Sequence, residues 1–210
     1  MKYEIIRDYS RRTQFDFFRK YNNPRYSCSI ELDITEIREF VRSRGWPLYA
    51  NLCWLSTRAM NELEDFRLRI HQGEIVRYER INLSLVVPAD DGGFSFAYLD
   101  YEQDMQAFNE TAAFALGGPR GESDLTDDGR QDLVFYSALP DVQFTSLTHI
   151  AEDDPQHAVP KITFGKHFER HGRLLAPVGI QVNHIFIDGN HLGDYVKKFT
   201  DFCANPSRFV

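Results

Sequence analysis

The 210-residue sequence has only three cysteines, Cys28, Cys53 and Cys203. An odd number without the spacing of metal ligands indicates neither a disulfide framework nor a zinc site, so we expect no metal and a reducing, cytoplasmic environment. The sequence also has no apolar run of about 18 residues and no apolar signal core after Met1. These absences predict a soluble, unexported protein with no membrane partner.

The sequence is also short of positive charge. It has 24 Lys and Arg against 31 Asp and Glu, a net charge of −7. Nucleic-acid binding usually requires a basic surface, so we expect no nucleic-acid partner. With 42% apolar and 26% charged residues, the composition is that of a globular protein, and 210 residues can bury a substantial core. No repeat or linker divides the chain, so residues 1–210 are predicted to form one domain.

The chain contains helical and strand patterns in mixed order. Many expected strands are joined by tight turns rather than by helical crossovers, which predicts an α+β fold, a two-layer sandwich in which helices cover a mixed sheet. Ser10 is expected to cap the first helix. We expect helices over residues 10–21, 35–44, 48–63, 104–116 and 192–202, a surface loop over 117–129, and strands over 26–34, 67–71, 74–78, 82–87, 94–99, 132–138, 142–148, 161–166 and 174–183.

A His-x-x-x-Asp-Gly pattern, His184 to Gly189, joins the last expected strand to the last expected helix. A histidine here can act as a base near neutral pH, because its ordinary pKa is about 6.5. The alternative is a turn in which Asp188 or Asn190 caps the helix and Gly189 adopts a positive φ. The pattern alone leaves both interpretations open.

Further segments of distinctive sequence precede this pattern along the chain, beginning with an aromatic-x-Arg-x-x-x-Phe segment. They are Tyr9 to Phe15, Leu32-Asp33-Ile34-Thr35, Asp65-Phe66-Arg67, Gly73-Glu74, Ser137-Ala138-Leu139-Pro140, Phe144-Thr145-Ser146, Thr163-Phe164-Gly165-Lys166 and Pro177 to His184. Together, and in this order, they resemble the trimeric chloramphenicol acetyltransferases, and the resemblance runs nearly end to end.

The resemblance implies an acyltransferase fold and acetyl transfer from acetyl-CoA to a small-molecule alcohol, without an acyl-enzyme. It implies that His184 is the general base and that Ser137 stabilises the tetrahedral oxyanion. It also implies that Asp188 turns away from His184 and forms a structural ion pair with Arg11. In such a homotrimer, His184 faces Ser137 of a neighbouring subunit.

The resemblance assigns further residues to binding. Lys166 and His167 match the segment beside coenzyme A, and Thr163 matches a polar position near the reacting centre. The positions that match the acceptor pocket are Phe17, Phe18, Tyr26 and Phe135. For Phe17 and Phe18, packing in the hydrophobic core is an equal alternative to lining the pocket. By contrast, the alternating Ser146 and Thr148 are expected to be ordinary strand residues.

The chain departs from the family pattern around the acceptor. Asn183 replaces a histidine, Phe135 an asparagine and Asp141 a tryptophan, while His149, His157 and Lys161 replace apolar or aromatic residues. The general base is retained in a more polar pocket, so chloramphenicol is one candidate acceptor among alcohols. Two alternatives are a dihydrolipoyl acyltransferase core and a non-catalytic binding protein that keeps the fold.

Overall fold

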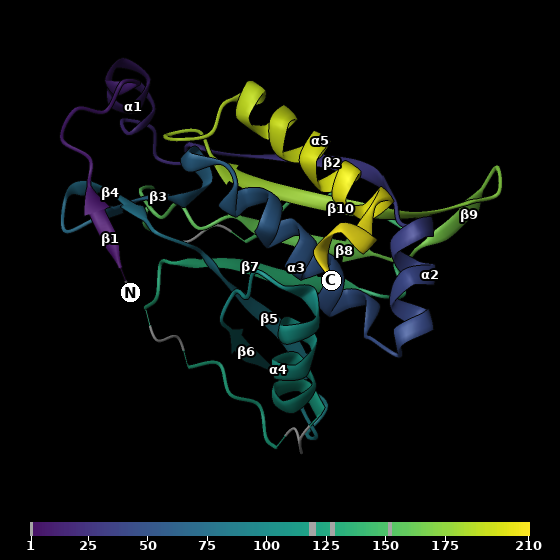
Figure 1. The fold of residues 1–210 in the computed structure, drawn as a ribbon. Helices are drawn as coiled ribbons and strands as arrows, with labels where there is room; N and C mark the ends of the chain where they lie inside the picture. The colour runs from purple at the N-terminus through teal and green to yellow at the C-terminus, as the bar shows by residue number, and fades with distance from the viewer. Residues whose placement is uncertain (1, 118–120, 127–128, 151–152) are drawn as a thin grey trace.

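The computed structural model describes residues 2–117, 121–126, 129–150 and 153–210. Within them lies a seven-stranded mixed sheet whose main path has the order β2-β10-β8-β7-β5-β6, while β9 pairs with one end of β10. Strands β8, β7 and β5 are parallel, and the other pairs are antiparallel. Helices pack against one face of this sheet (Figure 1). The predicted α+β class with a mixed, helix-covered sheet is confirmed.

The bounds of the elements agree with most of the expected segments. The helices are α1 (Arg12–Phe18), α2 (Thr35–Arg44), α3 (Leu48–Asn61), α4 (Met105–Gly117) and α5 (Gly189–Ala204), with short 3-10 turns η1 (Glu64–Arg67) and η2 (Pro206–Phe209). The strands are β1 (Tyr3–Ile5), β2 (Arg25–Asp33), β3 (Leu68–His71), β4 (Glu74–Tyr78), β5 (Asn82–Pro88), β6 (Phe94–Leu99), β7 (Leu133–Leu139), β8 (Lys161–Gly165), β9 (Phe168–Arg170) and β10 (Arg173–Asn183).

Two expectations about these elements need correction, and a third lies partly outside the described residues. Ser10 does not cap α1: Arg11 occupies the N-cap position and makes no side-chain cap. Strands β1 and β9 were not expected, since three residues are too short to show alternation. The expected loop over 117–129 includes residues 118–120 and 127–128, which lie outside the described residues. No helix in the described part of the chain is long and apolar enough to cross a membrane.

Helix α3 lies at the centre of the helical layer and is buried on nearly every side, as expected from its scarcity of charge. Its polar residues are therefore paired internally, because a buried polar group without a partner is costly. The Asn51 and Asn109 side chains exchange hydrogen bonds of 2.9 and 2.8 Å. The Thr57 hydroxyl lies 2.8 Å from the hydroxyl of Tyr136 on β7. This contact fixes which face of β7 meets the helices.

Because side chains alternate across a strand, Ser137 points to the opposite face of the sheet from Tyr136. The register of the ladder places Ser137 beside Thr163 of β8, and Thr163 beside Gly179 of β10. Helices α3 and α5 cover the other face (Figure 1). No helix in the described part of the chain covers the face that carries Ser137 and Thr163, which is called the open face below.

The expected strand over 142–148 is wrong: the segment 141–150 forms no strand and crosses the open face. Its apolar side chains meet the sheet at glycines, where a Cβ would clash. A Cβ on Gly165 would lie 2.8 Å from the Phe144 ring, and a Cβ on Gly179 would lie 2.7 Å from Leu147 Cδ2. The apolar pattern reflects packing onto these glycines, so Ser146 and Thr148 are not ordinary strand residues.

This packing predicts that Gly179→Ala destabilises the protein. We expect the free energy of unfolding to fall by about 1–3 kcal/mol, because the added methyl group displaces Leu147 from a close-packed position. Urea unfolding followed by fluorescence measures the change. In the double variant Gly179→Ala/Leu147→Ala the total cost should be smaller than the sum of the single costs. Strictly additive costs would show that the two residues do not press on each other.

A second, three-stranded sheet of β1, β4 and β3 is joined to the main sheet by Arg69. Its guanidinium is almost fully buried and donates to the carbonyl oxygens of Gln131 at 2.8 Å and Leu133 at 3.0 Å, and also to those of Phe66 and Leu68. Burial lowers the pKa of Arg69 to about 10. The bonds to Gln131 and Leu133 anchor the beginning of β7, the strand that carries Ser137.

Candidate active site

His184 lies in the turn between β10 and α5, and the preceding residue builds that turn. The Asn183 Oδ1 accepts a hydrogen bond of 3.0 Å from the backbone N–H of Ile185, and its Nδ2 donates to the carbonyl oxygens of Pro155 and His157. The His184 N–H donates to the carbonyl of Pro24 at 2.9 Å. The backbone at His184 is thus held from both sides of the turn.

The imidazole of His184 is held by aromatic rings. Phe18, the last residue of α1, stacks on it with a centroid distance of 3.9 Å and an interplanar angle of 11°. The Tyr26 ring lies 4.9 Å from it on the β2 side. The side chain remains 33% exposed, so an external molecule can reach it. The ring is fixed in orientation but accessible, as a proton-transferring group must be.

Asp188 connects this histidine to the N-terminal segment. One carboxylate oxygen forms an ion pair with Arg11, whose guanidinium also donates to the carbonyl of Phe186 at 2.5 Å and lies 3.9 Å from Asp65. The other oxygen lies 3.1 Å from His184 Nδ1. That distance suits an ion pair, although the geometry is not that of a hydrogen bond. The expectation that Asp188 turns away from His184 is therefore wrong.

Three buried polar atoms beside one another have no hydrogen-bond partner among the described residues: His184 Nδ1, Asp188 Oδ1 and the Tyr26 hydroxyl. Burial, together with the nearby Asp188 carboxylate, raises the pKa of Tyr26 to about 12. The hydroxyl therefore stays protonated at neutral pH and can donate a hydrogen bond. Such a cluster is unusual in a fully packed interior and is typical of a functional site.

The sequence assigns no role at this site to two of its residues. His191, in the first turn of α5, accepts a hydrogen bond of 3.0 Å at Nδ1 from the backbone N–H of Asp188. Its Nε2 lies 3.7 Å from Asp65. The spacing of three residues after Asp188 is that of a capping box, and this signal could have identified His191. Asp65 comes from η1, so only the fold brings it here.

Ser137 belongs to a different cluster, on the open face. Its Oγ lies 2.6 Å from the Thr163 Oγ1, and His149 Nε2 lies 2.9 Å from that same Thr163 oxygen. Thr163 is almost fully buried, whereas Ser137 and His149 are half-buried. The three side chains come from β7, β8 and the crossing segment 141–150, which share no local sequence.

The structure does not bring Ser137 and His184 together within one chain. Ser137 lies two strands away from Gly179 on β10, and His184 follows Gly179 by five residues. Strands lie about 4.8 Å apart and rise about 3.3 Å per residue, so the two residues are separated by roughly 15–20 Å. One chain therefore holds two separate clusters, one around His184 and one around Ser137.

A polar hollow of about 540 Å³ lies on the open face beside the Ser137 cluster and includes His149. Ser146 and Thr148, expected to be ordinary strand residues, line it as well. Its walls come from β2, β10 and the segment 141–150. The lining residues are Asn23, Arg25, Tyr26, Ser27, Ser29, Thr145, Ser146, Leu147, Thr148, His149 and Gln181.

The other expected binding residues occupy separate places. Phe17 is 54% exposed and packs its ring against Phe18, so it is not a core residue. Phe135 stacks on His157 with a centroid distance of 6.0 Å. Lys166 and His167 are exposed between β8 and β9, immediately after the strand that carries Thr163.

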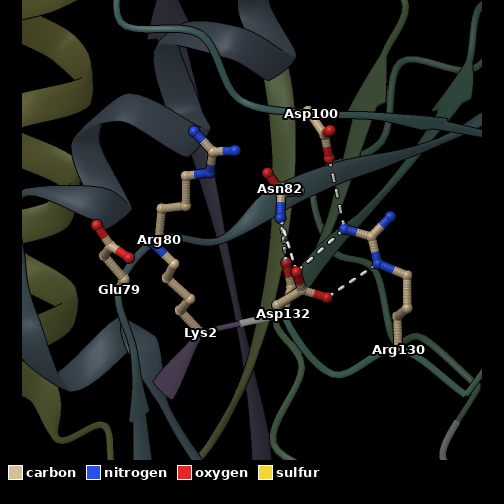
Figure 2. Close-up of a pocket in the computed structure, with 7 residues that line it drawn as sticks. All are labelled: Lys2, Glu79, Arg80, Asn82, Asp100, Arg130 and Asp132. Atoms are coloured by element: carbon tan, nitrogen blue, oxygen red, sulfur yellow. Dashed lines mark hydrogen bonds and ion pairs between the residues drawn. The ribbon is translucent and has the colours of Figure 1, made fainter. Parts of the chain in front are cut away.

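A second hollow, of about 470 Å³, is lined by charged residues where the small sheet meets the main one (Figure 2). The Arg130 guanidinium contacts the Asp132 carboxylate at 3.0 Å and Asp100 at 3.6 Å. The amide of Asn82 donates to Asp132 at 2.8 Å. These four side chains pair with one another where the two sheets meet.

The chain is similar to a known family over nearly its whole length. The family model described as chloramphenicol acetyltransferase matches residues 1–200. Similar proteins include chloramphenicol acetyltransferases of Proteus mirabilis, 24% identical over 94% of this chain and 92% of that protein, and of Streptomyces acrimycini, 26% identical over 94% and 91%.

Two solved structures are similar to the chain in fold. A chloramphenicol acetyltransferase superposes with a TM-score of 0.90 and 30% identity, covering 96% of this chain and 100% of the other. The dihydrolipoamide acetyltransferase of Azotobacter vinelandii superposes with a TM-score of 0.62 and 19% identity, covering 94% and 88%. The second match concerns the fold alone.

Proposed function

Because the chain belongs to the chloramphenicol acetyltransferase family, we propose that it transfers an acetyl group directly from acetyl-CoA to a hydroxyl group of a small molecule. The protein is an acyltransferase, and acetyl-CoA is its acetyl donor. The observation that carries the proposal is His184, held by Phe18 and Asp188 and still accessible from outside.

His184 is the proposed general base. The carboxylate 3.1 Å from Nδ1 favours the tautomer with the proton on Nδ1, which leaves the lone pair of Nε2 available. Nε2 removes the proton from the acceptor hydroxyl as its oxygen attacks the thioester carbonyl. The imidazolium formed is stabilised by Asp188, and its proton can then pass to the departing thiolate. Asp188 thus has an electrostatic task in addition to its ion pair with Arg11.

Ser137 is the proposed oxyanion donor. Attack on the thioester creates a negatively charged oxygen, and a positioned hydroxyl stabilises it most where water is excluded. Thr163, almost fully buried beside it, supports the position of the Ser137 hydroxyl. The exposed Lys166 and His167 are proposed to contact the acetyl-CoA, since a lysine ammonium is a suitable partner for its phosphate groups.

The cluster around His184 and the cluster around Ser137 are proposed to be two half-sites. Their separation within one chain supports a homotrimer in which the active site lies between subunits. A separation of roughly 15–20 Å is too large for His184 and Ser137 of one chain to act on the same carbonyl. His184 of one subunit would therefore face Ser137 of its neighbour. Each chain, proposed to fold as a single domain over residues 1–210, would contribute both kinds of half-site.

The hollow on the open face is proposed to hold the acceptor. Phe17, Phe18, Tyr26 and Phe135 supply aromatic walls in the proposed site, whereas the hollow itself is lined mainly by hydroxyl, amide and imidazole groups. This lining favours an acceptor that makes several hydrogen bonds. Chloramphenicol, named for the relatives, is the first acceptor to test, and growth of a host on chloramphenicol would test a role in resistance. The free cysteines fit the cytoplasm as the proposed location.

The proposed activity is tested by thiol release from acetyl-CoA with chloramphenicol and a panel of polyhydroxylated alcohols. We expect acceptor-dependent release and an acetylated product identified by mass spectrometry. Tight acetyl-CoA binding without turnover on any acceptor would instead support a non-catalytic binding protein.

Complementation tests the shared site. His184→Ala and Ser137→Ala subunits, each nearly inactive alone, are denatured, mixed in equal amounts and refolded together. Random assembly places an intact His184 opposite an intact Ser137 in about a quarter of the sites, so about a quarter of wild-type activity should return. Separately refolded variants mixed afterwards are the control. If co-refolding restores nothing although mixed oligomers form, the two residues do not share a site across subunits.

A further inference from the structure

A row of hydrogen-bonded side chains runs from His149 through Thr163 to Ser137. The His149 Nε2 lies 2.9 Å from the Thr163 Oγ1, which lies 2.6 Å from the Ser137 Oγ. Both distances are within the range of good hydrogen bonds. The row begins in the polar hollow, which His149 lines, and ends at the proposed oxyanion donor.

Proton counting gives this row a direction. The Thr163 hydroxyl has one proton, so it can donate to only one of its two neighbours and must accept from the other. If Ser137 is to donate its own proton to an oxyanion, its Oγ is free to accept the bond from Thr163. Thr163 then accepts from His149, whose Nε2 must carry a proton.

We propose that His149 is a positioning residue for acetyl transfer: its Nε2–H, acting through Thr163, orients the Ser137 hydroxyl towards the oxyanion. This role rests on the proposed function of Ser137. Hydrogen bonds arranged in one direction polarise one another, and the near-complete burial of Thr163 limits competition from water. Without the donor at His149, Thr163 can turn its proton away from Ser137, and Ser137 can donate to Thr163 instead.

The location of His149 suits this task. It belongs to the segment 141–150, which is held against the sheet where Leu147 packs on Gly179. It lines the proposed acceptor hollow together with Gln181 and Thr148. The His149 side chain therefore contacts both the proposed acceptor site and the row that ends at Ser137. Binding of the acceptor and the orientation of the Ser137 hydroxyl are thus coupled through this one residue.

The first test compares two substitutions of similar size. His149→Leu removes the donor, and His149→Gln keeps an N–H at about the position of Nε2. We expect His149→Leu to lower kcat by about tenfold with little change in the KM for acetyl-CoA, because one weakened oxyanion donor costs less than its complete loss. His149→Gln should restore most of the rate. Equal losses in both variants, each folded by its thermal transition, would overturn the role of the donor.

A double-variant cycle provides the second test. Thr163→Val interrupts the row with a side chain of the same shape, so adding His149→Leu to it should cause little further loss. Fully multiplicative losses would mean that His149 does not act through Thr163. His71→Leu, on β3 of the small sheet, is the matched control and should leave kcat unchanged.

If the hydrogen bonds ran the other way, Ser137 would donate to Thr163 and Thr163 would donate to His149. Ser137 would then be a nucleophile with His149 as its base. Mass spectrometry of the enzyme quenched during turnover distinguishes the two cases. An acetyl group on Ser137 would overturn the proposal, whereas an unmodified Ser137 supports it. A wild-type protein without any acetyl transfer would overturn the proposed function itself. An active wild type with an unaffected His149→Leu variant would overturn only the role of His149.

Discussion

His184→Ala is expected to lower kcat for acetyl transfer by about 10²–10⁴-fold, the contribution of a positioned general base. An acceptor hydroxyl is a weak nucleophile unless its proton is removed as it attacks, and methyl replacement leaves no group to accept that proton. The thermal transition should change little, because the His184 backbone bond to Pro24 is kept. Thiol release and product formation, measured together, give the loss in turnover.

Two further variants make this result specific. His184→Gln retains a polar side chain of similar length but cannot accept and release a proton near neutral pH, so its activity should be as low as that of His184→Ala. His71→Ala, at the end of β3, controls for loss of a histidine elsewhere. Activity of His184→Gln close to that of the wild type would mean that the residue positions the substrate and does not act as a base.

The second large effect is expected at the ion pair between Arg11 and Asp188. Arg11→Met should lower the free energy of unfolding by about 2–3 kcal/mol, because it leaves the Asp188 carboxylate without its partner. The side chains are only 18% and 32% exposed, and the remaining exposure of Asp188 places the cost below that of a fully buried pair. Chemical denaturation measures the loss.

Asp188→Asn separates the two tasks of Asp188. The amide keeps the shape but removes the charge from Arg11 and from His184 Nδ1, so both stability and kcat should fall. In the double variant Arg11→Met/Asp188→Asn, stability should be higher than the sum of the single losses predicts, because no lone charge remains. Loss of stability with unchanged kcat in the folded fraction would contradict the electrostatic task beside His184.

Several structural features followed directly from local sequence. The low charge of residues 48–63 indicated a buried helix, and α3 occupies most of that range. The pattern of apolar residues identified β2 and β10 nearly to their ends, although β10 is buried on both sides over most of its length. The strand-to-helix turn at His184 was also readable, since β10 ends at Asn183 and α5 begins at Gly189.

Other features depended on partners that are distant in the chain. The pattern over 142–148 predicts a strand, because an extended segment packed on a sheet face has the same alternation as a strand within a sheet. Gly165 and Gly179, which accept Phe144 and Leu147, reveal the difference only after folding. In the same way, the sequence pairs Asp188 with Arg11 alone, although in the fold its second oxygen reaches His184.

The sequence by itself determined the family resemblance, the mixed α+β class and the candidate residues His184 and Ser137, because these depend on local patterns and on their order along the chain. Only the tertiary structure decided that Asp188 lies between Arg11 and His184, that His149 reaches Thr163, and that Ser137 and His184 of one chain lie far apart. Hydrogen bonds and ion pairs act over about 3–4 Å, and folding alone decides which distant side chains come within that range.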